Sequence, residues 1–151
     1  MKSNWIVILG CGLFVLGIWK LSGPRHIDSV DPSTDTVTQA AAWVGLGVLD
    51  WEAGDLENAE MKFKVALGCD PGNPAATSNL AGVLLERART EPNKEKQREM
   101  CLTAAKGYLV VSELRPNDPL VWRNLGAALN NAGMLGEAKV AFERAKELEG
   151  G

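Results

Sequence analysis

The feature that most constrains this chain is an internal repeat, because the sequence matches itself when it is shifted by 79 positions. Nine identities fall within 24 positions of the first copy, far more than composition alone would produce. The identical pairs are Trp43 with Trp122, Leu46 with Leu125, Gly47 with Gly126, Ala53 with Ala132, Gly54 with Gly133, Leu56 with Leu135, Ala59 with Ala138, Phe63 with Phe142 and Ala66 with Ala145. The same structural unit is therefore built at least twice.

Each copy has the pattern of a helical hairpin. Apolar and small residues recur at helical spacing on both sides of a glycine, Gly54 or Gly133, which can take the positive φ of a tight turn. Small residues such as Gly47 and Ala59 let two helices approach closely, and Phe63 fills the space beside them. The spacing thus predicts helix packing and not a set of reactive groups.

These residues resemble the tetratricopeptide repeat (TPR) family, whose 34-residue unit reads W-x2-L-G-x2-Y, then A-x3-F, then P. The first copy begins near Ala40 and ends with Pro71 in place; the last begins near Pro119 and lacks the closing proline. The resemblance implies an all-α, right-handed solenoid of three hairpins, with repeats over about 40–73, 74–118 and 119–151. The position of the family's large aromatic residue is occupied by Asp50 in the first copy, so the packing there departs from the pattern.

The middle copy spans 45 residues, 11 more than the family unit. The extra residues fall in the charged segment 86–99, ERARTEPNKEKQRE. We predict two lengthened helices with a projecting tip. A run of charges of this kind is typical of a solvated helix surface, and an acidic partner that binds it is the alternative.

The N-terminal segment differs from the rest in composition. Residues 5–19, WIVILGCGLFVLGIW, carry no charge and are followed by Lys20. With the residues around it, this run reaches the length of a minimal membrane span, and Trp5 and Trp19 stand where interfacial tryptophans are favoured. We predict a single-pass anchor over residues 1–21. A cleaved signal peptide is the rival, but no small-residue cleavage site follows the apolar run.

Residues 22–38 are rich in Pro, Ser, Thr and Asp, which predicts a linker before a repeat domain over residues 39–151. The positive-inside rule barely decides the topology, because Lys2 opposes Lys20 and Arg25. We expect the inner (cytoplasmic) membrane with a periplasmic repeat domain. A repeat domain on the cytoplasmic side of this membrane is the alternative.

Composition and motifs disfavour several classes of function. The net charge of -3 disfavours nucleic acid as a partner. The sequence has no phosphate-binding loop and no His or Cys set at ligand spacing, so we expect neither enzyme activity, nor a small-molecule substrate, nor a metal or other cofactor. Its three cysteines are unevenly placed, and we expect no disulfide framework.

The TPR resemblance implies that the first helix of each hairpin lines a concave groove that holds a peptide or helix of another protein. The groove positions that it implies are Val44, Val48, Trp51, Ser78, Leu85, Arg123, Ala127, Asn130 and Asn131. This groove would be apolar at one end and polar at the other. Trp51 can serve either binding or local packing, because tryptophan is both a common hot spot and a core filler.

Together these features predict a membrane-anchored interaction module, acting as an adaptor or assembly factor for a membrane or envelope protein complex. The alternative is a permanent accessory subunit of such a complex.

Overall fold

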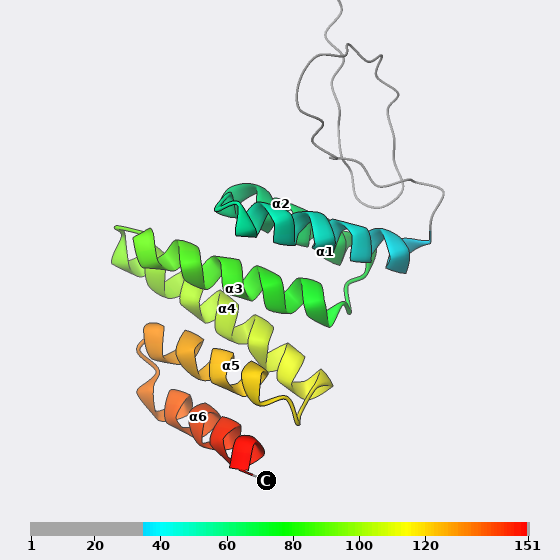
Figure 1. Ribbon diagram of the computed structural model, residues 1–151. Coiled ribbons are helices and arrows are strands. Elements are labelled where there is room, and N and C mark those ends of the chain that lie inside the picture. Colours follow the sequence, from blue (N-terminus) through cyan, green and yellow to red (C-terminus); the bar gives the residue numbers. More distant parts are fainter. Residues whose placement is uncertain (1–34, 151) are drawn as a thin grey trace, which may run out of the picture.

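The computed structural model describes residues 35–150, which form six α-helices and no strand within that range. Their bounds are α1 Thr36–Glu52, α2 Leu56–Cys69, α3 Pro74–Thr90, α4 Lys94–Leu114, α5 Pro119–Asn131 and α6 Leu135–Gly150. Successive helices pair into three hairpins, which stack in chain order with α1 and α6 at opposite ends (Figure 1). The predicted all-helical, three-hairpin architecture is confirmed for these residues.

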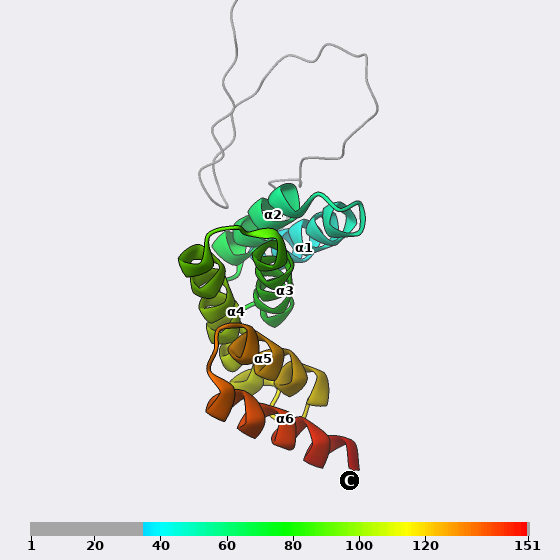
Figure 2. The same cartoon turned by 90° about the vertical axis from the view of Figure 1, so that its left-hand side faces the viewer.

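The stack bends toward its first helices. Contacts run from α1 to α3 and from α3 to α5, whereas α2 and α4 do not contact each other within the described range. Helices that lie closer together line the inner side of a curve, so α1, α3 and α5 form the concave face. The side view in Figure 2 shows the hairpins as successive layers.

Local sequence signals fix the helix ends. Asp55, Asn73 and Asp118 are the N-caps of α2, α3 and α5, because their side chains accept hydrogen bonds from backbone N–H groups at the start of these helices. Gly54 and Gly133 both have a φ of 81°, the left-handed conformation that each tight turn requires. Turn and cap chemistry thus repeats with the sequence.

The first helix begins earlier than the sequence suggested. Asp35 caps α1 by accepting a bond from the Thr38 N–H at 3.0 Å, so residues 36–38, placed in the linker above, are helical. The hydrogen bonds from Thr38 also lower the pKa of the Asp35 carboxyl. The predicted anchor, residues 1–21, lies outside the described residues. No helix in the described range is long and apolar enough to cross a membrane.

The middle hairpin is lengthened mainly through α4, which has 21 residues, because α3 has 17 residues, the same number as α1. Its inserted part does not simply project. Arg98 donates to the Ala132 carbonyl at 3.1 Å, and Ala88 and Cys101 form an apolar cluster with Ala132 at the turn between α5 and α6. The insertion therefore braces the third hairpin.

Both cysteines in the described range are buried. Cys101 is a free, buried thiol whose pKa is raised by burial. Cys69 is buried at the end of α2, in a cluster with Ala40, Ala66 and Ala76.

Candidate concave binding face

The apolar end of the concave face lies on α1. Val44, Val48 and Trp51 all pack against one cluster, whose buried centre includes Phe63 of α2 and Val83 of α3. The three side chains are half-buried. The structure therefore brings these three predicted groove residues together, as a surface that is continuous with the core.

Trp51 joins the first hairpin to the second. Its indole N–H donates to Glu86 Oε2 at 2.6 Å, and its ring meets the Phe63 ring edge-on at 6.4 Å. A methyl group added at Gly82 would lie 2.4 Å from the indole, so only glycine leaves room for the ring on α3. Trp51 thus packs between repeats while part of its surface faces solvent. The bond to Glu86 was not foreseen from the sequence.

The two predicted groove residues of α3, Ser78 and Leu85, lie at different places along the helix. Leu85 is half-buried against clusters that reach α4 and α5, so it belongs to the seam between the second and third hairpins. Ser78 is half-buried nearer the start of the helix.

The polar end lies on α5, where Arg123, Asn130 and Asn131 are exposed and Ala127 is half-buried. Arg123 forms an ion pair with Glu149 near the end of α6. Asn130 borders a shallow hollow of about 360 Å³ that is otherwise lined by α6. Residues of α5 and of the last helix, α6, therefore both contribute to this polar end.

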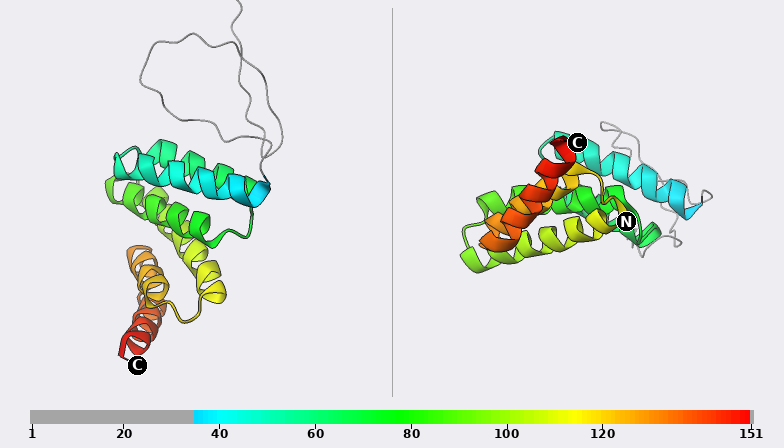
Figure 3. Two further views of the ribbon diagram at one scale, coloured as in Figure 1. Left: turned by 45° about the vertical axis from the view of Figure 1, so that its right-hand side comes forward. Right: turned by 90° about the horizontal axis from the view of Figure 1, so that it is seen from below.

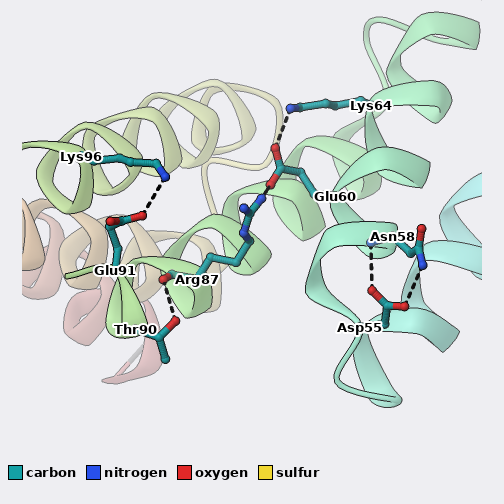
Figure 4. A network of polar contacts seen from close by, with 8 residues as sticks. All are labelled: Asp55, Asn58, Glu60, Lys64, Arg87, Thr90, Glu91 and Lys96. Atoms are coloured by element: carbon teal, nitrogen blue, oxygen red, sulfur yellow. Dashed lines mark hydrogen bonds and ion pairs between the residues drawn. The ribbon is translucent and has the colours of Figure 1, made fainter. Parts of the chain in front are cut away.

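A second polar network lies between α2 and α3 (Figure 4). Glu60 accepts from Lys64 at 2.5 Å and also pairs with Arg87 of α3. Burial acts to raise the pKa of the Glu60 carboxyl, but the bonds from Lys64 and Arg87 lower it below its usual value overall. This pair links the second helix of one hairpin to the first helix of the next.

No group of three His, Cys, Asp or Glu side chains that could hold a metal ion occurs among the described residues. The concave face offers apolar area, amides, carboxylates and one guanidinium. Such a set suits non-covalent recognition of a polypeptide.

No protein-family model matches the chain, and no curated protein matches it in sequence. Solved TPR structures are nevertheless similar to it. The first TPR of Spaghetti (RPAP3), bound to the HSP90 peptide SRMEEVD, has a TM-score of 0.64 at 21% identity, covering 75% of this chain and 81% of that one. The Sgt2 TPR domain from Aspergillus fumigatus has a TM-score of 0.60 at 22% identity, covering 85% and 73%.

A third similar structure, the MamA protein, has a TM-score of 0.61 at 20% identity and covers 76% of this chain and 56% of that one. Likeness at such identities shows the fold alone. The fold of residues 35–150 is TPR-like, as the sequence pattern indicated.

Proposed function

We propose that this chain is a protein–protein interaction module that binds a peptide or helix of another protein on the face formed by α1, α3 and α5. The observation that carries the proposal is the graded composition of this face, from half-buried Val44, Val48 and Trp51 to exposed Arg123 and Asn131. An apolar anchor beside polar groups is the usual layout of a peptide-binding surface. The proposal includes no enzyme activity and no cofactor.

The fold supports the proposal by likeness. One similar TPR structure holds the HSP90 peptide SRMEEVD. Capture of a terminal carboxylate is not part of our proposal, because the TPR proteins that clamp such a carboxylate have a basic residue and an asparagine where this chain has Val44 and Val48. We propose instead that the apolar side of a partner helix or strand lies near Trp51.

The finer proposal concerns the setting of this module. We propose that residues 1–21 anchor it in the inner membrane, with the repeat domain in the periplasm, where it serves as an adaptor or assembly factor for a membrane complex. Mass spectrometry of membrane-extracted protein should then find peptides containing Trp5 or Trp19. A mature N-terminus at Pro24 would show instead that the apolar run is a cleaved signal.

Site-specific photocrosslinking in native membranes tests the binding face. A crosslinker at Ala127 should capture a partner, whereas one at Lys94, on the exposed tip between α3 and α4, should not. Capture from Lys94 alone would move the binding surface to the inserted tip. A partner that stays stoichiometric through detergent purification would favour the alternative role of a permanent subunit.

Charge reversal refines this test. Arg123→Glu should weaken partner binding, because the variant changes the sign of the only basic groove residue. The variant also breaks the ion pair with Glu149. Glu149→Gln breaks the same pair but leaves Arg123 positive, so it is the matched control. Equal loss of binding in both variants would mean that the ion pair matters and that Arg123 does not contact the partner.

A further inference from the structure

The outer face of α6 repeats a surface that is buried elsewhere in the molecule. Phe142 corresponds to Phe63 in the internal repeat, and each ring packs on the equivalent glycine of the preceding helix, Gly126 or Gly47. Phe63 is fully buried in a cluster with Val83 of α3, whereas Phe142 is 40% exposed. Leu135, the counterpart of half-buried Leu56, is 66% exposed. The α6 face is therefore built to receive another first helix.

The first helix of the array has the complementary surface. Ala76, Leu80 and Val83 of α3 lie in clusters with residues of α2, and Ala76 and Val83 are fully buried. The counterparts of these three residues in α1, one repeat earlier, are Ala42, Leu46 and Leu49.

These counterparts are less well covered. Ala42 is exposed, Leu46 is half-buried, and Leu49 is 62% exposed. Both ends of the array thus carry one half of a seam that is complete inside it. The left view in Figure 3 shows α6 (orange to red) at the lower end of the stack and α1 (cyan) at the upper end.

The charges at the two ends are also complementary. In the internal seam Glu60 of α2 pairs with Arg87 of α3. The counterpart of Glu60 in α6 is Lys139, whose side chain is 77% exposed, so the sign is reversed. At the other end, α1 contains no basic residue, and exposed Glu52 lies next to the position that corresponds to Arg87. A copy that stacked through α1 would bring Glu52 toward Lys139.

We infer that two copies of this chain associate head to tail, with α6 of one copy packed on α1 of the next in the geometry of the internal α2–α3 seam. Leu135 and Phe142 of one copy meet Leu46 and Leu49 of the other, and Lys139 faces Glu52. The two surfaces differ, so the contact is heterologous and leaves a free surface at each end of the pair. This association is independent of binding in the groove.

The test uses the full chain in a mild detergent, with sedimentation velocity at about 1 to 100 μM, the range in which contacts of modest affinity dissociate. Wild-type protein should form oligomers larger than a dimer as its concentration rises. Leu49→Glu and Leu135→Glu each block one surface, and each variant alone should be monomeric. Both leucines are exposed, so circular dichroism should show unchanged helix content.

The decisive experiment mixes the Leu49→Glu and Leu135→Glu variants. Each retains the surface that the other lacks, so a mixture should form a dimer that cannot grow. A monomeric mixture, or a Leu49→Glu variant that still dimerises alone, would overturn the inference, because the second result indicates an isologous contact through α6. Association that persists when both substitutions are in one chain would also overturn it, since another segment must then mediate the contact.

Charge exchange checks the register of the two helices. Lys139→Glu and Glu52→Lys should each weaken association, and a chain with both changes should recover it, because the pair is restored with its signs exchanged. Failure of the double variant to recover, with each single variant impaired, would exclude the proposed register. The matched control is Lys106→Glu, an exposed lysine of α4 outside both surfaces, which should leave association unchanged.

Discussion

Lys62 of α2 and Asp50 of α1 form an ion pair inside the first hairpin, with 2.7 Å between Nζ and Oδ2 and both side chains 8% exposed. Asp50 stands where the TPR pattern has a large aromatic residue. The Oδ2 atom accepts no hydrogen bond beyond this contact from the described residues. A polar pair thus occupies a site that the pattern reserves for packing.

We predict that Asp50→Ala lowers the free energy of unfolding by about 3 to 5 kcal/mol, because it removes the carboxylate that faces a buried ammonium group. The double variant Asp50→Leu with Lys62→Met should lie within about 1 kcal/mol of wild type or exceed it, since neither charge then has to be desolvated. Chemical unfolding measures both. A double variant as unstable as Asp50→Ala would mean that the pair is needed for the fold.

The sequence predicted those parts of the fold that depend on neighbouring residues along the chain. The turn glycines Gly54 and Gly133 and the caps Asp55 and Asn73 act within a few residues, so their effects can be recognised without knowing the tertiary structure. The repeat then fixed which helices pair. The hairpins were predictable for this reason.

Contacts between repeats were harder to predict. The Trp51–Glu86 bond joins residues 35 positions apart, and nothing local to either one indicates it. Phe142 corresponds to Phe63 in the repeat, but within the described residues no helix covers it as α3 covers Phe63, and it is 40% exposed. The groove assignment likewise rests on the resemblance, and it stays a prediction.

The two equivalent glycines provide a second prediction. A methyl group at Gly47 would lie 2.6 Å from the Phe63 ring, and one at Gly126 would lie 2.7 Å from the Phe142 ring. Phe63 is enclosed and cannot yield, whereas half-exposed Phe142 can swing toward solvent. Gly47→Ala should therefore cost about 1 to 3 kcal/mol by overpacking.

Gly126→Ala should be close to neutral, because relief of the contact is combined with the gain of about 0.5 to 1 kcal/mol for alanine in a helix. Thermal and chemical unfolding of the two variants side by side measure the difference. Equal losses at the two sites would show that Phe142 is held as firmly as Phe63.

Truncation of the two phenylalanines is the third prediction. Phe63→Ala should cost about 3 to 5 kcal/mol, as for an aromatic ring removed from a packed core. The loss for Phe142→Ala should be clearly smaller in dilute solution, since less of its surface leaves water on folding. Lys94→Ala, at the exposed tip, should change stability by less than about 0.5 kcal/mol. A Lys94 variant as damaging as Phe63→Ala would contradict the repeat register.

The last prediction concerns alkaline pH. Tyr108 of α4 is 4% exposed and packs in the cluster that joins the second and third hairpins. Burial raises the pKa of its hydroxyl from 10.0 to about 12, because the charged phenolate is poorly solvated there. Tyr108 is the only tyrosine in the chain, so absorbance near 295 nm follows its ionisation without interference from other tyrosines.

The sign of the effect follows from the two states. At pH values well below 10 the hydroxyl is neutral whether the chain is folded or unfolded, so Tyr108 contributes no pH dependence to the free energy of unfolding. As the pH rises from about 10 to 12, the unfolded chain loses the proton first, so the free energy of unfolding should fall by about 2 to 3 kcal/mol in total. Tyr108→Phe removes this loss and is the matched control, because lysines that titrate in the same range are common to both proteins. If wild type and Tyr108→Phe lose stability equally between pH 9 and 12, the Tyr108 hydroxyl ionises in the folded state as readily as in water, and its burial does not control the alkaline limit of the fold.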